Sequence, residues 1–295
     1  MKRLHLIVNP QSGSKKGLHI RDIVISQLKK SDYEVLSYVS EYKGHPLELT
    51  KNLKLNTSDL IGVIGGDGTM HEVINGLLQR KDKMKVPIGL IPAGTGNSLM
   101  HDLNCLNPKE AVKRIIFGKK RKLDILKINS GAGQYYSFNI IGWGIPSWVN
   151  IVAEKIRYLG GQRYNLASLI ELVKNKSSWV SLTMDGNTVE GQYGFILACN
   201  TKYTGNGLKM APGAEFDDGL VELITTTRLS RIRLLFLFIK LFRGTHLSDP
   251  AISVNRVKAF SVRSTEKMPL NIDGQIIGTS PFSVEMMQGH LEIFV

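Results

Sequence analysis

The chain has 295 residues, 42% apolar and 21% charged, which is typical of a folded globular protein long enough for two domains and excludes a disordered or fibrous protein. Lysine and arginine outnumber aspartate and glutamate by 38 to 25, and the net charge of +13 predicts an anionic partner: a nucleotide, a nucleic acid or an acidic membrane. Two cysteines, Cys105 and Cys199, are too few for a disulfide framework and indicate a reducing compartment.

The first residues read as a strand, since their apolar run stops at Asn9, before the length that a signal peptide needs. From there to about Arg121, short β-branched runs alternate with helix-compatible segments, which predicts an α/β domain over residues 1–121. We expect strands at residues 3–8, 33–39, 60–64 and 87–91, and helices at 17–30, 46–55, 71–79, 97–103 and 108–117.

Residues 122–295 show short alternating strands joined by glycine and asparagine turns, which predicts a mostly antiparallel β domain. Helix-like segments interrupt it at 149–158 and 166–174. We expect strands at residues 180–184, 193–199, 258–263, 270–272, 282–286 and 291–295. The pattern leaves open whether the last strand returns to the first domain.

One loop in the first domain has the composition of a phosphate-binding loop. A buried strand leads into Gly65-Gly66-Asp67-Gly68-Thr69 and then into a helix. Glycines let the backbone approach a phosphate, and a helix N-terminus favours negative charge. The same residues would also suit a tight turn with Asp67 as a simple helix cap.

Two further loops follow strands of the same domain. Pro92-Ala93-Gly94-Thr95-Gly96-Asn97 repeats the order of strand, glycine-rich loop and helix start, and Asn9-Pro10-Gln11-Ser12-Gly13 follows the first strand. In a parallel sheet all three would emerge at the carboxyl edge, where ligands of open α/β folds bind. The chain contains no GxxxxGK[ST], GxGxxG or GxSxG motif, no HxxxH pair and no nucleic-acid-binding motif.

Taken in order, these motifs resemble the diacylglycerol kinase catalytic-domain family, which includes bacterial diacylglycerol kinases, sphingosine kinases and ceramide kinases. They are Asn-Pro-x-Ser-Gly at 9–13, Gly-Gly-Asp-Gly-Thr at 65–69, Pro-Ala-Gly-Thr-Gly-Asn at 92–97, Asp-Asp-Gly-Leu at 217–220 and Asp-Gly at 273–274. The resemblance covers nearly the whole chain. It implies an NAD kinase/phosphofructokinase-like α/β nucleotide-binding domain followed by a β-sandwich.

The resemblance implies ATP and Mg²⁺ as cofactors and a set of nucleotide contacts. The segment from Trp143 to Tyr164 looks like the sphingosine and ceramide kinase branch, in which arginines at the positions of Arg157 and Arg163 contact phosphates; a solvated helix face is the alternative for Arg157. The candidate nucleotide contacts are Asn9, Pro10, Ser12, Gly13, Ser40, Gly65, Gly66, Asp67, Gly68, Thr69, Glu72, Gly94, Thr95, Gly96, Asn97, Arg157, Arg163 and Gly274.

Two carboxylates are candidates for the general base. Bacterial relatives carry Asp-Gly-Glu where this chain has Asp273-Gly274-Gln275, and the amide of Gln275 cannot accept the proton. By resemblance to sphingosine kinases the base is Asp67, and Asp273 is the alternative. Weak activity, or none in a non-catalytic nucleotide- or lipid-binding relative, is the further possibility.

Metal and substrate residues are also implied by the resemblance. Bacterial members hold a structural magnesium at positions matching Glu215, Asp218 and the carbonyl of Leu220, although these residues would also suit an acidic turn. Asn150 stands where sphingosine kinases place an aspartate for the lipid headgroup. An asparagine provides no charge for an amine, so diacylglycerol or ceramide remains open beside a sphingoid base.

The longest apolar stretch, at 234–239, is far shorter than the roughly 20 residues of a membrane span. It lies within a basic helical segment at 228–244 that would suit either an anionic membrane surface or a cover for the β domain. We therefore expect a cytoplasmic ATP-dependent lipid kinase, associated transiently with the inner face of a membrane and binding no nucleic acid. An NAD kinase-like enzyme is the alternative, and the sequence leaves the oligomeric state open.

Overall fold

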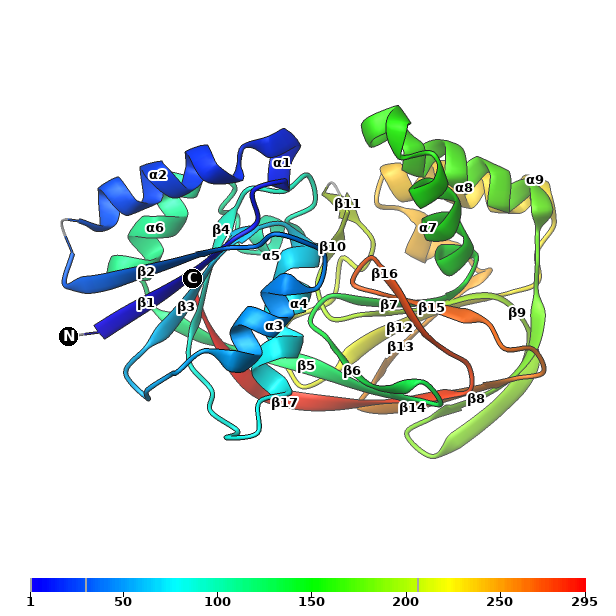
Figure 1. The fold of residues 1–295 in the computed structure, drawn as a ribbon. Coiled ribbons are helices and arrows are strands. Elements are labelled where there is room, and N and C mark those ends of the chain that lie inside the picture. The colour runs from blue at the N-terminus through cyan, green and yellow to red at the C-terminus, as the bar shows by residue number, and fades with distance from the viewer. Residues whose placement is uncertain (1, 30, 206) are drawn as a thin grey trace. The chain divides into compact units, whose positions relative to one another are not determined.

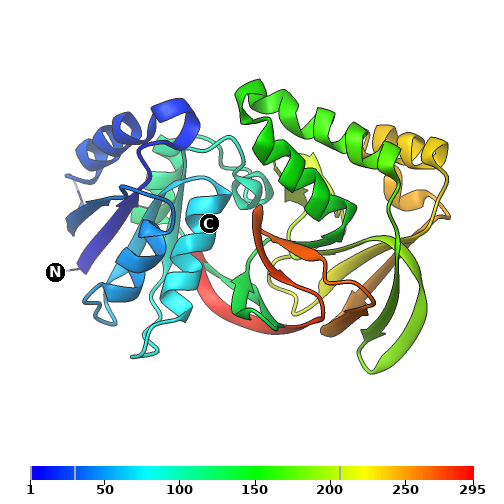
Figure 2. The same cartoon turned by 45° about the vertical axis from the view of Figure 1, so that its right-hand side comes forward.

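The computed structural model describes residues 2–29, 31–205 and 207–295; the side chains of Ser14 and Arg157 lie outside this description. The chain forms two compact units. Unit 1 comprises residues 1–125, 203–207 and 288–295, and unit 2 comprises residues 126–202 and 208–287. Figure 1 labels the elements, and Figure 2 turns the same ribbon.

Unit 1 is built on a parallel sheet of strands in the order β4-β3-β1-β2. The strands are β1 (Lys2–Val8), β2 (Tyr33–Val39), β3 (Leu60–Gly65) and β4 (Ile88–Pro92). All six residues of β3 are buried, as expected for a central strand covered on both faces. The four expected strands are therefore present, each within a residue of its expected bounds.

Helices cover both faces of this sheet (Figure 1). One pair, α2 (Gly17–Leu28) and α6 (Pro108–Phe117), contributes Val24, Leu28 and Val112 to the core cluster with β1 and β3. The other pair, α3 (His45–Asn52) and α4 (Asp67–Leu78), packs together. Short helices α1 (Ser12–Lys15) and α5 (Ser98–Asp102) follow β1 and β4.

Two long strands run through both units. They are β5 (Lys120–Ser130) and β17 (Phe282–Phe294). The end of β17 lies in unit 1, where Ile293 pairs in parallel with Ile88 of β4. The strands expected at 282–286 and 291–295 are thus one continuous strand, because residues 287–290 stay extended between them.

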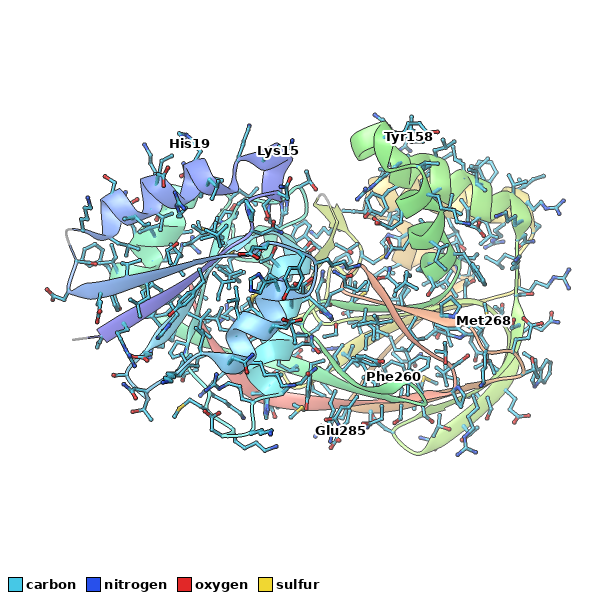
Figure 3. All side chains as sticks on the ribbon, viewed as in Figure 1. Lys15, His19, Tyr158, Phe260, Met268 and Glu285 are labelled. Atoms are coloured by element: carbon cyan, nitrogen blue, oxygen red, sulfur yellow. The ribbon has the colours of Figure 1, made fainter. Side chains whose placement is uncertain are left out.

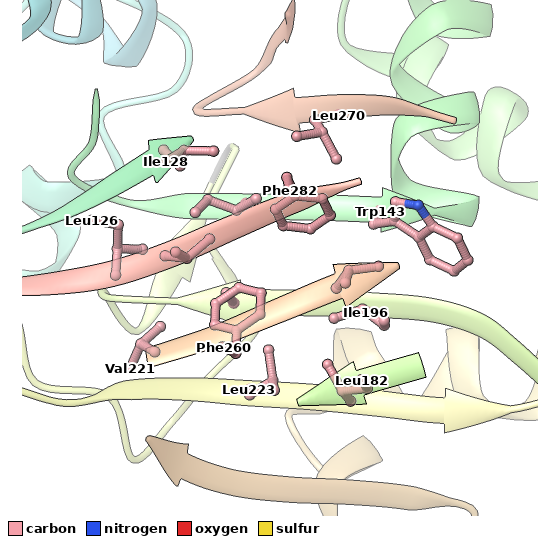
Figure 4. Close-up of a cluster of buried hydrophobic side chains, with 14 of the residues drawn as sticks. Leu126, Ile128, Trp143, Leu182, Ile196, Val221, Leu223, Phe260, Leu270 and Phe282 are labelled. Atoms are coloured by element: carbon pink, nitrogen blue, oxygen red, sulfur yellow. The ribbon is translucent and has the colours of Figure 1, made fainter. Parts of the chain in front are cut away.

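Unit 2 is mostly antiparallel, in the order β16-β15-β7-β9-β8-β14-β17, with β12 and β13 extending from β9, and β5 and β6 from β17. The further strands are β6 (Gly133–Ser137), β7 (Ile140–Gly144), β8 (Ser178–Met184), β9 (Asn187–Cys199), β11 (Leu208–Lys209), β12 (Val221–Thr227), β13 (Ile252–Val257), β14 (Ala259–Ser264), β15 (Pro269–Ile272) and β16 (Gln275–Thr279). The short β10 (Tyr203–Thr204) belongs to unit 1. Trp143, Phe260 and Phe282 lie in the core of unit 2 (Figure 4).

The helices of unit 2 are α7 (Ile145–Lys155), α8 (Arg163–Lys174) and α9 (Arg231–Phe242), with 3₁₀ turns η1 (Arg157–Gln162) and η2 (His246–Ser248). The expected helix at 149–158 begins earlier, at Ile145, because a proline suits the first turn of a helix. No helix in the described part of the chain is long and apolar enough to cross a membrane. The predicted fold class, an α/β unit and a mostly antiparallel β unit, is confirmed.

Candidate nucleotide-binding site

Three loops follow the parallel strands β1, β3 and β4 of unit 1 and meet at their carboxyl ends. The loop after β1 is held to β3, since the Asn9 N–H donates to the Ile64 carbonyl at 3.0 Å. Asn9 Nδ2 also donates to Thr69 Oγ1 at 3.0 Å, which joins the first loop to the first turn of α4. Three motifs from separate parts of the sequence are thereby assembled at one sheet edge, as predicted.

The second and third loops approach each other through glycines. A Cβ added to Gly94 would lie 2.5 Å from the Gly66 Cα, and one added to Gly66 would lie 3.0 Å from the Gly94 Cα. The Gly94 N–H donates to the Gly65 carbonyl at 3.2 Å. Side chains at these positions would force the loops apart, so the glycines are required by close backbone approach.

Asp67 is the first residue of α4, and its carboxylate is held by Ser98. Oδ1 accepts from the Ser98 backbone N–H at 2.7 Å, and Oδ2 accepts from the Ser98 hydroxyl at 2.8 Å. Helix α4 was expected to begin at His71, but it begins four residues earlier, at Asp67, with Gly66 as its N-cap. Asp67 thereby links the loop after β3 to the loop after β4.

Asn97 presents an unused acceptor inside these loops. Its Nδ2 donates to the Gly94 carbonyl at 2.8 Å, while its Oδ1 is buried and has no partner. That oxygen lies 3.5 Å from the position that a Cβ on Gly94 would take. A buried acceptor without a partner is uncommon and points to a donor that binds there, from a ligand or a water.

The remaining candidates of unit 1 surround these loops. Ser12 and Ser40 are buried, and the Ser40 N–H continues the β1–β2 ladder by donating to the Val8 carbonyl. Glu72 accepts from the Gly44 N–H at 3.1 Å, and burial raises the pKa of its carboxyl. Pro10 and Gly68 are half-buried, while Thr95 is exposed.

The candidate arginines belong to unit 2. Arg163 begins α8, where its Nη2 donates to the Tyr164 hydroxyl at 3.1 Å and lies 3.7 Å from Glu154 Oε1. Its Nε is buried without a partner, which leaves a donor for a ligand. The side chain of Arg157, the other candidate, lies outside the described residues.

Asp273 occupies the turn between β15 and β16. Its carboxylate accepts hydrogen bonds from the Ser137 hydroxyl and from the backbone N–H groups of residues 138, 139 and 140, at 2.6 to 3.2 Å. Asp273 is also buried. These four hydrogen bonds hold the β15–β16 turn against the β6–β7 connection. Because they already occupy the carboxylate oxygens, Asp273 is poorly placed to take a proton from a substrate.

Asn150, on α7, is tied to the same turn. Its Nδ2 donates to the Gly274 carbonyl at 2.7 Å. The Oδ1 of Asn150 is buried and without a partner. This oxygen is an uncharged acceptor that could receive a hydroxyl.

The residues expected to hold a metal do not form a metal site in this structure. Asp218 Oδ1 accepts from the Leu220 N–H at 2.9 Å, and its Oδ2 contacts the guanidinium of Arg256. Glu215 is exposed, and the described residues contain no group of three or more acidic, histidine or cysteine side chains that could hold a metal. Arg256 supplies the positive charge at this loop, so we derive no step through a metal there.

Comparison with known proteins agrees with this geometry. The family model described as the diacylglycerol kinase catalytic domain matches residues 3–128. A second model, the YegS C-terminal NAD kinase beta sandwich-like domain, matches residues 139–295. The chain belongs to the diacylglycerol kinase family. The predicted family, and with it a lipid kinase, is confirmed.

Individual members of the diacylglycerol kinase family are distant from this chain. A diacylglycerol kinase of Bacillus subtilis is 29% identical, with 99% of this chain and 96% of the relative covered. Sphingosine kinase 1 of Arabidopsis thaliana is 27% identical over 88% of this chain, which spans 64% of that relative's length. A solved diacylglycerol kinase from Bacillus anthracis, 23% identical, shares the fold with a TM-score of 0.80, covering 99% of this chain and 96% of its own.

The sequence of this diacylglycerol kinase family member did not identify two residues that hold candidate site residues in place. Ser98, the partner of Asp67, directly follows the loop motif 92–97, and a hydroxyl at a helix start was a usable signal. Arg256 lies 38 residues beyond Asp218, on β13 opposite Glu222 of β12. Only the register of two strands brings it to the acidic loop, so no local pattern could have identified it.

Proposed function

We propose that the protein transfers the γ-phosphate of ATP to a hydroxyl group of a lipid. The observation that carries this proposal is the set of interlocked loops after β1, β3 and β4, with Asp67 fixed between two of them by Ser98. Phosphoryl transfer depends on positioned phosphates and on a group that takes the acceptor's proton. Family membership identifies the acceptor class as a lipid.

The nucleotide phosphates are proposed to lie against the glycine loops. Close packing of Gly66 on Gly94 leaves backbone rather than side chains at the sheet edge, and the 12-residue helix α4 directs its N-terminus there. The free Oδ1 of Asn97 can accept a hydrogen bond from a nucleotide hydroxyl or amino group. ATP enters with Mg²⁺, which belongs to the substrate complex. We keep Arg163 and Arg157 as proposed phosphate contacts.

Asp67 is proposed as the general base. It accepts two hydrogen bonds from Ser98, which orient the carboxylate between the two loops. In the reaction the acceptor oxygen bonds to the γ-phosphorus, its proton passes to the Asp67 carboxylate, and the bond to the leaving ADP oxygen breaks. The four hydrogen bonds that Asp273 accepts make it the weaker candidate.

A neutral lipid is the proposed acceptor. The free oxygen near the Asp273-Gly274 turn is that of Asn150, an amide, which can receive a hydroxyl but cannot pair with a protonated amine. We therefore favour diacylglycerol or ceramide over a sphingoid base. A lipid acceptor places the reaction at a membrane, so we propose a cytoplasmic protein that associates transiently with its inner face.

The test is transfer of label from ATP, with Mg²⁺ present, to diacylglycerol, ceramide, sphingosine and NAD offered separately. We expect labelled diacylglycerol or ceramide, and labelled NAD phosphate alone would instead support the NAD kinase-like alternative. No product with any acceptor would favour a non-catalytic relative.

The Asp67→Asn variant tests the base. General bases contribute about 10² to 10⁴ in rate, so turnover should fall by at least that order while ATP still binds. Gln275→Ala, the matched variant on β16, should retain much of the activity. The reverse pattern would remove Asp67 from the mechanism.

A further inference from the structure

Helix α9 of unit 2 is apolar on two opposite faces. Leu234 and Leu237 are buried, in the positions that face the unit. A second stripe is exposed, with the spacing i, i+3, i+4, i+7 and i+10 of one helix face: Ile232 (71% exposed), Leu235 (44%), Phe236 (62%), Ile239 (45%) and Phe242 (56%). Packing against unit 2 explains why the buried face is apolar. It does not explain why the exposed face is apolar as well.

Helix α8 carries a matching stripe. Leu166, Leu169 and Val173 are exposed at the spacing i, i+3 and i+7. The two helices touch, as both views show (Figures 1 and 2), and their inner faces share one cluster through Leu172 and Leu234. Tyr158, in the preceding turn η1, is 82% exposed (Figure 3). Exposed apolar side chains thus gather on one helix pair, a concentration that marks an interaction surface.

The charge around this helix pair is strongly positive. Segments 155–176 and 228–243 contain ten lysine and arginine residues and a single acidic residue, Glu171, which is buried and paired with Lys174. These segments therefore supply nine of the chain's 13 net positive charges. An uncharged or basic partner would not be attracted by this excess, whereas an anionic surface would be.

The position of α9 is fixed from within its unit. Ser230 caps its N-terminus by accepting from the Arg233 N–H at 3.3 Å. Asp249 forms ion pairs with Arg233 at 2.8 Å and with Lys240 at 2.6 Å, so these two cations are used internally. Arg231 and Arg243, at the two ends of the helix, are exposed and have no ion-pair partner among the described residues. They are free to meet an external anion.

We propose that the outer faces of α8 and α9 form a docking surface for an anionic lipid bilayer. The apolar stripes enter the boundary between headgroups and acyl chains, and Arg231 and Arg243 contact anionic headgroups, as in helices that lie in a membrane interface. The inference rests on the proposed function in one respect: a lipid acceptor lies in a membrane, so the enzyme must bind there to reach it. The surface itself is argued from exposure and charge.

Vesicle co-sedimentation without nucleotide tests the proposal, with vesicles of phosphatidylcholine alone and of phosphatidylcholine mixed with phosphatidylglycerol. The full chain should bind the mixed vesicles and bind phosphatidylcholine alone much more weakly. Phe236→Gln with Ile239→Gln, and separately Arg231→Gln with Arg243→Gln, should each weaken binding about tenfold or more.

Matched controls lie in unit 1. Phe117→Gln removes an aromatic ring that is 84% exposed at the end of α6, and Lys54→Gln with Lys81→Gln removes two exposed charges. These variants should bind mixed vesicles as the parent chain does. Because every substituted side chain is exposed, thermal unfolding should show all variants folded.

A soluble assay separates this proposal from the kinase proposal. With short-chain diacylglycerol in detergent micelles, the α9 variants should keep the parent's turnover. If micellar turnover is absent while vesicle binding follows the predicted pattern, the kinase proposal fails and the docking surface stands. If the parent binds neither vesicle, if the α9 variants bind unchanged, or if they only dissociate a dimer in size-exclusion chromatography, the docking surface is wrong.

Discussion

Asp273 Oδ1 accepts a 2.6 Å hydrogen bond from the hydroxyl of Ser137, 136 residues away in the chain. Oδ1 also accepts from the backbone N–H groups of residues 139 and 140, and Oδ2 accepts from that of residue 138. The carboxylate therefore holds two connections of unit 2 together. Asp273→Asn should lower the free energy of unfolding by about 1–3 kcal/mol, since hydrogen bonds to a charged group are lost.

The measurement for Asp273→Asn is urea denaturation combined with turnover per folded molecule. Asp22→Asn, at an exposed carboxylate paired with the adjacent Arg21, is the matched control and should change little. Turnover of folded Asp273→Asn should stay within several-fold of the parent. A loss as large as that of Asp67→Asn, without a loss of stability, would restore Asp273 as the base.

Gly94→Ala tests the close approach of the phosphate loops. The added methyl group would lie 2.5 Å from the Gly66 Cα, a backbone atom that cannot move aside without separating the loops. We expect ATP affinity to fall at least about tenfold, with a stability loss of about 1–3 kcal/mol. Gly131→Ala, where a Cβ meets nothing within 4 Å, should leave both unchanged. Isothermal titration calorimetry with ATP would show whether Gly94→Ala binds normally, which would contradict the assigned site.

Asp249 should make the protein sensitive to acid. Hydrogen bonds from Lys240 and Arg233 hold the pKa of the Asp249 carboxyl well below its ordinary value of 3.8. Since the folded pKa is lowered, the stabilisation is present above about pH 4 and is lost as the pH falls toward the folded pKa. Thermal unfolding between pH 7 and the acid limit should therefore show a flatter profile for Asp249→Asn than for the parent. Parallel profiles would mean that these ion pairs contribute nothing.

Arg256 should make the acidic loop independent of divalent cations. Its guanidinium already contacts Asp218, and burial raises the pKa of the neighbouring Glu222 carboxyl while the charge of Arg256 opposes that rise. The melting temperature of the parent chain, measured without nucleotide, should be the same in EDTA and in Mg²⁺. Arg256→Gln should melt lower and should recover part of the loss when Mg²⁺ is added. A parent chain destabilised by EDTA would instead support a metal at Glu215, Asp218 and Leu220.

Much of unit 1 could be predicted because its signals are local. The buried strand before Gly65 and the glycine loops at 65–69 and 92–97 each lie within a dozen residues, so a parallel sheet edge follows from them directly. The start of α4 was harder to place, because Asp67 looks like a cap in the sequence. Its carboxylate turns out to bind Ser98, 31 residues further on.

The sequence says less about contacts that depend on strand register. Asp273 pairs with residues 137–140, and Arg256 reaches Asp218 only because β13 lies beside β12. The helix at 228–244 shows a different limit. Its composition suits both a helix that covers the β unit and a helix that lies at a membrane interface. Only the exposure of each side chain separates the two roles: Leu234 is buried against the unit, whereas Phe236 is exposed.

The route of β17 has a consequence for the order of assembly during synthesis. Residues 288–295 complete unit 1, with Ile293 beside Ile88, yet they leave the ribosome after the whole of unit 2. The loops proposed to bind the nucleotide, although encoded first, therefore lie on a sheet whose final strand is synthesised last. A nascent chain that stops short of residue 288 would carry every phosphate-loop motif on an unfinished support, so ATP binding should appear only after translation of the final strand.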